Sequence, residues 1–123
     1  MKLIGLSMFA SGGIGETYVN DIGNIEIKVA NELEKNRAKF YSHFHKNVTM
    51  IQGDITDKDI FNKVLKESID KKVNFIISTP PCQGFSKAGK QDENDTRNTL
   101  IKYVMDMINK IKPEYAMIEN LQK

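Results

Sequence analysis

The thiol of Cys82 is the strongest nucleophile that this sequence offers, and Cys82 is the only cysteine among 123 residues. It follows an apolar run at residues 75–77 and two prolines, which end a β-strand because proline cannot donate to the strand ladder. The thiol is therefore expected in a loop at the carboxyl end of a strand, where open α/β sheets bind their ligands. A lone cysteine can also be a small buried hydrophobic residue, but the flanking Pro81 and Gln83 favour the reactive role.

Glycines follow the first apolar run of the chain. Residues 9–16 read Phe-Ala-Ser-Gly-Gly-Ile-Gly-Glu, and glycine permits a tight turn and close approach of a ligand to backbone amides at a helix N-terminus. Three glycines near a turn can also serve packing alone. The segment fails the dinucleotide-binding pattern GxGxxG, because counting from Gly13 places Tyr18 at the last glycine position.

Two carboxylates, those of Glu32 and Asp54, follow the second and third apolar runs. A carboxylate after the second strand can accept hydrogen bonds from both hydroxyls of a ribose. One after the third strand can accept a hydrogen bond from the exocyclic amine of a purine. Each acid alone is also a candidate helix cap or solvated loop residue. Beside the glycine turn, the two together predict a nucleoside site that needs no Lys or Arg.

The elements that must position these residues alternate between short β-like runs and amphipathic helical runs, which predicts an α/β fold with a mostly parallel sheet. We predict strands over residues 2–8, 25–30, 48–52, 73–78 and 115–118, and helices over residues 14–21, 32–44, 58–69 and 97–111. Thr56 or Asp57 is suited to cap the third helix, and Asp95 or Thr96 the fourth. No helix follows the fifth strand, so we expect an incomplete three-layer, Rossmann-like sheet of about five strands.

The composition indicates one globular domain, with 40% hydrophobic residues. A single cysteine excludes an internal disulfide, and no stretch resembles a signal peptide or a membrane span, so we expect a cytoplasmic location. The net charge of +2 comes from interspersed lysines, which permits contact with nucleic acid without arguing for it. No metal site is predicted. The polar loop over residues 80–95 is long, and such loops are more often functional than idle.

Taken together, these residues resemble the cytosine-5 DNA methyltransferases, from the first strand to the last residues of the chain. That family has a phenylalanine and glycine turn for S-adenosylmethionine, an acid after each of strands two and three, a PCQ loop with the nucleophile, and an ENV tripeptide after strand five. The matching residues here are Phe9 with Gly13, Glu32, Asp54, Pro81-Cys82-Gln83 and Glu119-Asn120-Leu121, and Asp95-Thr96-Arg97 with Leu100 resembles the stretch into the fourth helix. The resemblance implies that residues 1–123 form the N-terminal part of a class I methyltransferase catalytic domain, of the kind found in restriction–modification systems.

The resemblance also implies an S-adenosylmethionine site at the strand ends. Its residues would be Phe9, Ala10, Ser11, Gly13, Ile14, Glu32, Leu33, Asp54, Ile55, Pro81 and Leu100. We expect the adenine to lie against Phe9 and Ile55. Ser11 stands where the family usually has glycine, and Ser7 where it often has aspartate. The Cβ of Ser11 is therefore expected to crowd the methionine moiety of the cofactor.

Cytosine C5 is a poor nucleophile, so a thiolate must first add to C6. The resemblance assigns that addition to Cys82. It assigns to Glu119 hydrogen bonds to N3 and the exocyclic amine, which require a protonated carboxyl that burial favours; a solvated terminal position is the alternative. The target base must be flipped out of duplex DNA. Residues of the nucleophile loop are then expected to approach the DNA strand, namely Gln83, Ser86, Lys87 and Lys90.

Nothing in the sequence matches the family's later arginine-bearing strand, its target recognition region or its terminal segment. We therefore expect the chain to be inactive by itself, and its uncovered fifth strand to pair with a complementing chain or with a second copy. RNA cytosine methylation is an alternative that the same nucleophile loop would serve. A non-catalytic module that binds S-adenosylmethionine or only assembles with another polypeptide is a second. A thiol redox enzyme fits poorly, because no resolving cysteine is present.

Overall fold

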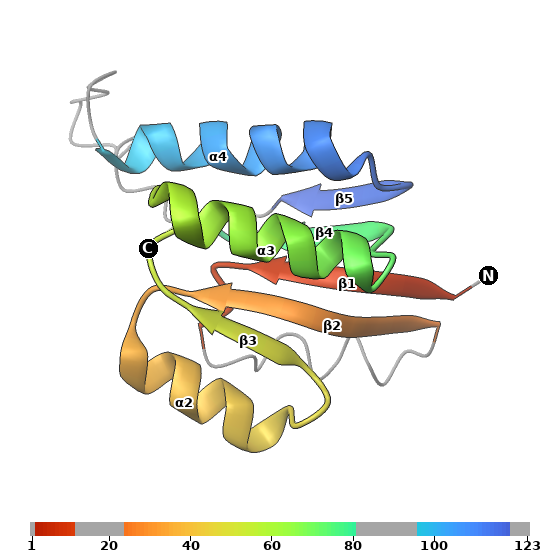
Figure 1. Cartoon of the computed structure of the whole chain (residues 1–123), viewed down its shortest axis with the longest axis horizontal. Coiled ribbons are helices and arrows are strands. Elements are labelled where there is room, and N and C mark those ends of the chain that lie inside the picture. Colours follow the sequence, from red (N-terminus) through yellow and green to blue (C-terminus); the bar gives the residue numbers. More distant parts are fainter. Residues whose placement is uncertain (1, 12–23, 81–95, 119–123) are drawn as a thin grey trace.

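A computed structural model of the chain describes residues 2–11, 24–80 and 96–118 (Figure 1). Its strands form one sheet in the order β3-β2-β1-β4-β5, in which every neighbouring pair is parallel. The strands are β1 (Leu3–Met8), β2 (Ile25–Glu32), β3 (Thr49–Gln52), β4 (Phe75–Ser78) and β5 (Tyr115–Ile118), and the helices are α2 (Lys35–Phe44), α3 (Lys58–Asp70) and α4 (Thr96–Ile111). The predicted α/β class and parallel sheet of five strands are confirmed.

The sheet winds outward from β1 in two directions, first through β2 to β3 and then through β4 to β5. The strand order therefore reverses between β1 and β4. In open α/β sheets such a switch point leaves a crevice at the carboxyl ends of the strands, and ligands bind there. The topology thus selects the carboxyl ends of β1 and β4 as the place to look for a site.

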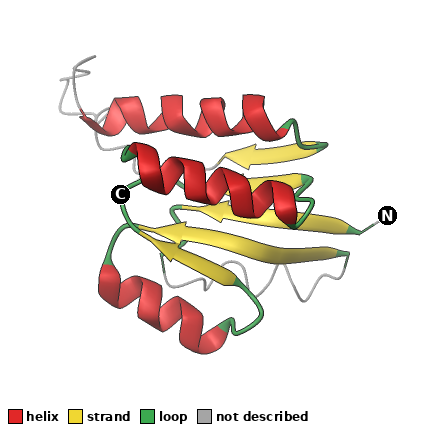
Figure 2. Ribbon diagram, in the orientation of Figure 1, coloured by secondary structure: helices red, strands yellow, loops and turns green. Residues whose placement is uncertain are grey.

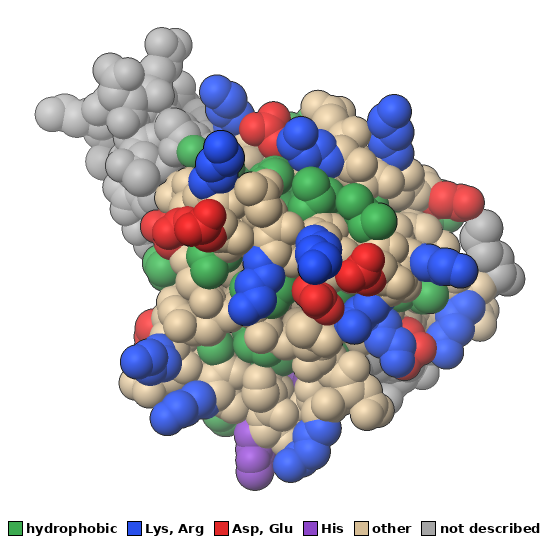
Figure 3. Space-filling view, in the orientation of Figure 1, with side chains coloured by type: hydrophobic (Ala, Val, Ile, Leu, Met, Phe, Trp, Pro, Cys, Tyr) green, Lys and Arg blue, Asp and Glu red, His purple; other side chains and the backbone are tan. Residues whose placement is uncertain are grey.

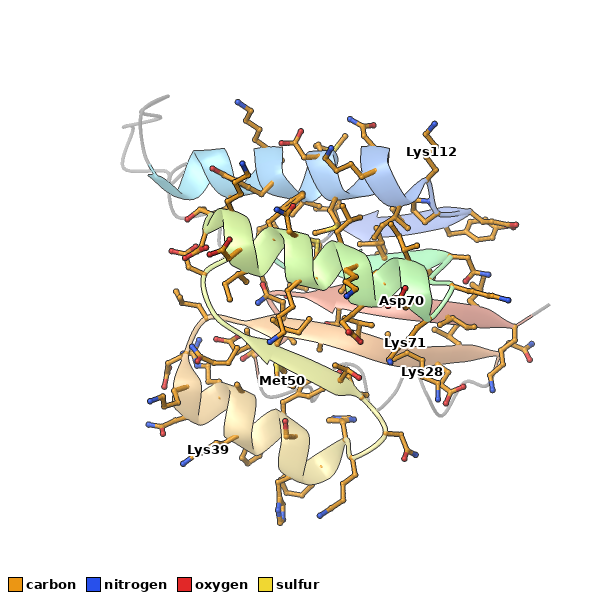
Figure 4. All side chains as sticks on the ribbon, in the orientation of Figure 1. Lys28, Lys39, Met50, Asp70, Lys71 and Lys112 are labelled. Atoms are coloured by element: carbon orange, nitrogen blue, oxygen red, sulfur yellow. The ribbon has the colours of Figure 1, made fainter. Side chains whose placement is uncertain are left out.

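Helices cover both faces of the sheet. Successive side chains of a strand point to opposite faces, so the strand side chains that a helix contacts show which face it covers. Leu6, Met8 and Val29 belong to a large core cluster that includes Phe61 of α3 and Val104 of α4. On the opposite face, Ala10 and Ala30 pack with Tyr41 of α2. Figure 2, in the orientation of Figure 1, shows α3 and α4 running along the direction of the strands, and Figure 4 shows Met50 of β3 beside α2. With α3 and α4 on one face of the sheet and α2 on the other, the chain has the expected three-layer arrangement.

β4 begins at Phe75, two residues later than predicted, and the largest departure from the predicted boundaries is at the junction of β2 and α2. The strand continues two residues beyond the predicted end, because Asn31 and Glu32 stay in register with Ile51 and Gln52 of β3. Helix α2 accordingly begins at Lys35 and not at residue 32. The helix predicted over residues 14–21 lies outside the described residues.

Two capping predictions can be compared with the structure. Asp57 caps α3, with its side chain accepting a hydrogen bond from the amide of Asp59 at 2.8 Å; Thr56 does not. Helix α4 begins at Thr96, one residue earlier than predicted, while Asp95 lies outside the described residues. Among the described helices, none is both long and apolar enough to cross a membrane.

Candidate functional site

The turn after β1 has an unusual backbone. Phe9 and Ser11 have positive φ angles of 59° and 53°, in the left-handed region that residues other than glycine seldom adopt. This backbone is held from both sides. The hydroxyl of Thr79, just after β4, donates to the carbonyl of Phe9 at 3.0 Å, and the amide of Ala10 donates to the carbonyl of Asn31 at 3.1 Å. Tertiary hydrogen bonds therefore maintain a conformation that local preference does not favour.

Glu32 completes this anchoring and is the most firmly held acid at the described strand ends. It is only 6% exposed. Its Oε1 accepts a hydrogen bond from the amide of Ser11 at 2.8 Å, and its Oε2 accepts one from the amide of Glu34 at 2.7 Å. Each carboxylate oxygen can accept a second hydrogen bond. The carboxylate is therefore held in one orientation and still has capacity for the two hydroxyls of a ribose.

Asp54 lies one strand further along and is exposed. Its Oδ1 accepts hydrogen bonds from the amide of Thr56 at 2.9 Å and from the hydroxyl of Thr56 at 2.7 Å. This is the local turn that an aspartate commonly makes with the residue two positions on. Oδ1 therefore stabilises the loop. No described residue donates a hydrogen bond to Oδ2, which can accept one from a ligand.

Asn31 is a positioning residue that the sequence reasoning missed. It is buried, and its Nδ2 donates to the carbonyls of Ile51 at 2.8 Å and Gly53 at 3.1 Å. Gly53 has a φ of 151°, and a Cβ there would lie 2.6 Å from Cδ1 of Ile60. Asn31 and Gly53 thus bring the end of β3 close to Glu32. The available signal was an amide side chain directly before the strand-end acid.

The apolar residues predicted for the cofactor differ in their exposure. Phe9 is half-buried, and Leu100 is partly buried against the same core cluster. Leu33 is 62% exposed beside Glu32, whereas Ile55 is buried in the core. Phe9 and Leu33 therefore present apolar surface at the carboxyl edge, while Ile55 supports the edge from within.

The structure brings together the predicted residues at the ends of β1, β2 and β3 and places Leu100 on α4. Predicted residues outside the described part are Gly13, Ile14, Pro81, Cys82, Gln83, Ser86, Lys87, Lys90 and Glu119. β4, which leads to the nucleophile loop, does end beside β1, with Ser78 paired to Met8. Across residues 2–11, 24–80 and 96–118, no group of three or more His, Cys, Asp or Glu side chains is placed to hold a metal ion.

Comparison with known proteins identifies relatives of this chain in sequence and in fold. A type II methyltransferase of Avibacterium volantium, M1.HgaI, is 50% identical over 125 residues, which cover 98% of this chain and 35% of that protein. A tRNA (cytosine(38)-C(5))-methyltransferase of Mus musculus is 32% identical over 98 residues, which cover 76% of this chain and 20% of that protein. The crystal structure of a prophage-encoded DNA modification methyltransferase from E. coli, described as putative, superimposes with a TM-score of 0.77 at 23% identity, covering 98% of this chain and 32% of the other.

The chain thus spans about a third of the length of the bacterial relative. Its residues 3–123 match the family described as C-5 cytosine-specific DNA methylase. The likeness to the solved structure shows the fold, and the match over nearly the whole chain shows the family. This chain belongs to the C-5 cytosine-specific DNA methylases.

Proposed function

We propose that this chain is the cofactor-binding and nucleophile-bearing part of an enzyme that methylates C5 of cytosine in DNA in the cytoplasm. The observation that carries the proposal is the carboxylate of Glu32, fixed by two backbone amides beside the turn at Phe9. That arrangement fits the ribose and adenine of S-adenosylmethionine, because an acceptor pair lies next to a half-buried aromatic ring. Bound there, S-adenosylmethionine would supply the electrophilic methyl group.

Cys82 and Glu119 do the remaining chemistry in this proposal, and residues of the nucleophile loop hold the DNA. The Cys82 thiolate adds to C6 of a flipped cytosine, forming a carbon–sulfur bond and raising electron density at C5. Glu119 hydrogen-bonds N3 and the exocyclic amine while charge develops on the ring. C5 would then take the methyl group, with S-adenosylhomocysteine as the leaving group. Loss of the C5 proton to a solvent base and elimination of the Cys82 thiolate then restore the C5–C6 double bond. Gln83, Ser86, Lys87 and Lys90 contact the DNA strand.

Binding of S-adenosylhomocysteine, measured by calorimetry, tests the cofactor site. Glu32→Ala should weaken binding more than tenfold, because a hydrogen bond to a charged group contributes roughly 1.5 to 3 kcal/mol and two are lost. The matched control is Glu26→Ala, which removes a carboxylate at the other end of β2, where it pairs with Lys2 and Lys28. The Glu26→Ala variant should bind S-adenosylhomocysteine with the affinity of the wild type. Equal affinity in a folded Glu32→Ala variant would refute the placement.

The nucleophile is tested with a complementing polypeptide supplied in trans. Cys82→Ser should abolish methyl transfer and leave S-adenosylhomocysteine binding unchanged, because a hydroxyl is a far weaker nucleophile than a thiolate at neutral pH. DNA that contains 5-fluorocytosine should trap the wild type covalently but not the variant. Methylation that survives in Cys82→Ser would overturn the assignment.

We also propose that residues 1–123 do not methylate DNA when they are alone, because the chain spans only 35% of the bacterial relative. Incubating the purified chain with duplex DNA and labelled S-adenosylmethionine should give no incorporation above that of Cys82→Ser. Robust incorporation by the isolated chain would contradict this expectation.

RNA is the second candidate substrate. The observation in its favour is the similarity to a relative named as a tRNA cytosine methyltransferase. The same thiolate addition to C6 would serve either nucleic acid, so the two substrates are separated by competition. With the complementing polypeptide supplied, incorporation into duplex DNA that excess tRNA does not suppress would support the DNA substrate.

A further inference from the structure

Helix α2 carries a cationic and aromatic outer face that the proposed methyl transfer does not use. With about 3.6 residues per turn, residues four apart lie on one side of a helix. Lys35, Lys39 and His43 form one exposed row, and Phe40 and Phe44 form a second exposed row beside it. We call these five residues the α2 face. The buried residues Ala38 and Tyr41 hold the opposite side of the helix against the sheet.

The two phenylalanines of the α2 face are unusually accessible for their type. Phe40 is 46% exposed and Phe44 is 62% exposed. Their ring centroids lie 4.8 Å apart, and the rings of His43 and Phe44 make an edge contact at 4.9 Å. Single exposed apolar residues need no explanation, whereas exposed apolar side chains that contact one another form a continuous apolar surface, a feature found at interaction sites.

The charge on this helix has one sign. Between residues 34 and 47 the sequence has four Lys or Arg residues and one acid, Glu34, and that acid pairs with Arg37 at 3.2 Å. Lys35 and Lys39 have no ion pair within the described residues, and Figure 4 shows the side chain of Lys39 extending from α2. Figure 3 shows blue and purple atoms along the lower rim of the molecule, where Figure 1 places α2.

The surface at the end of α2 is also hollowed. Phe44, His45 and Lys46 line one side of an open cavity of about 430 Å³, which the amino ends of β1 and β2 line on the other. This cavity lies at the opposite edge of the sheet from Glu32 and Asp54. The row of Phe40 and Phe44 therefore ends at this cavity, which is large enough to hold a planar group.

From this geometry we infer that the α2 face binds single-stranded nucleic acid. In this inference Lys35 and Lys39 contact the phosphates of the strand, and the rings of Phe40 and Phe44 stack on its bases. Proteins that bind single strands without sequence preference combine these two features, because every base has a face that can stack on an aromatic ring. Charge complementarity selects a polyanion, and the exposed ring pair selects unpaired bases over a duplex, whose bases are already stacked. The strand bound here is separate from the substrate at the carboxyl edge.

Fluorescence anisotropy with a labelled poly(dT) oligonucleotide tests this inference, because poly(dT) contains no cytosine and is no substrate for the proposed methyl transfer. Phe40→Ala/Phe44→Ala should weaken binding at least fivefold. Lys35→Glu/Lys39→Glu should weaken binding and lower the dependence of log affinity on log salt by about 0.7 for each phosphate that the lysines no longer neutralise. The matched control is Lys63→Glu/Lys66→Glu, on exposed positions of α3 across the sheet, which should bind poly(dT) like the wild type.

Any of three outcomes would overturn the inference: α2 variants that bind poly(dT) like the α3 control, duplex DNA that binds as tightly as poly(dT), or poly-glutamate of equal charge that competes equally well. S-adenosylhomocysteine binding should stay unchanged in the α2 variants, which shows that they are folded and that the cofactor site is independent. Conversely, Glu32→Ala should bind poly(dT) normally, so failure of the proposed function and failure of this inference are distinguishable.

Discussion

Ser11 shows how a single residue sets the strain at the site. Its φ of 53° costs a residue with a Cβ about 1 to 2 kcal/mol, and its amide bonds Glu32. Ser11→Gly removes this strain but increases the freedom of the unfolded chain, so the free energy of unfolding should change by less than about 1 kcal/mol. S-adenosylhomocysteine affinity should rise, because the Cβ no longer crowds the ligand. Calorimetry and urea denaturation measure the two quantities; a lower affinity would show that the Cβ does not crowd the ligand.

Hydrogen bonds from Lys2 and Lys28 lower the pKa of Glu26 to about 2. The ion pair of Lys2 with Glu26, at 2.8 Å, ties the start of β1 to β2, and the ion pair of Lys28 with Glu26, also at 2.8 Å, lies within β2. A lowered pKa means that the pairs stabilise the fold above the ordinary pKa of 4.5 and lose this effect as the pH falls toward 2. Because the partners are solvent-accessible, the contribution is about 1 kcal/mol. Glu26→Gln should flatten the fall in unfolding free energy between pH 4.5 and 2; an unchanged slope would contradict this.

At the scale of the element, α3 depends on its cap. Asp57→Ala should lower the free energy of unfolding by about 1 kcal/mol, because it removes the acceptor for the amide of Asp59. Thr56→Ala is the comparison, since Thr56 bonds Asp54 and not the helix. That variant should change stability less and should act instead on the orientation of Asp54. A larger loss in Thr56→Ala, measured by urea denaturation, would reverse the two roles.

The end of β2 shows what local sequence could not predict. Apolar runs predicted the ends of the described strands to within two residues, but at this end the polar pair Asn31 and Glu32 suggested that the strand was over. Both are buried, because carbonyls of β3 and amides at Ser11 and Glu34 satisfy them. Most of these partners are close only in three dimensions. Sequence could therefore name Glu32 as a site residue without predicting that the strand continues through it.

At the scale of the whole molecule, β5 forms an edge of the sheet, and all four of its residues are exposed. An exposed apolar edge strand is a template for pairing with another chain. The purified chain should therefore self-associate with rising concentration in sedimentation experiments. Met117→Lys should shift it toward monomer, whereas Met105→Lys, on an exposed position of α4, should not. A strictly monomeric wild type at all concentrations would contradict the prediction.

The strand order was also beyond the reach of local patterns, although the residues of β5 were predicted correctly. Alternating strands and helices predict a parallel sheet, but whether β4 follows β3 or returns to lie beside β1 depends on where the crossover packs. In this chain it returns to β1. That choice brings Thr79, just after β4, to Phe9 in the turn after β1, and the proposed function places the cofactor beside this turn.

The hydrogen bond from Thr79 to Phe9 joins residues 70 positions apart, which has a consequence for the order of synthesis. A chain emerges from the ribosome with its N-terminus first. The turn after β1 is made among the first residues, yet it lacks this anchor until β4 has emerged and docked. A nascent chain shorter than about 80 residues therefore lacks the complete turn after β1. If the turn binds S-adenosylmethionine as proposed, the chain becomes competent to bind it only once β4 has been translated and has docked.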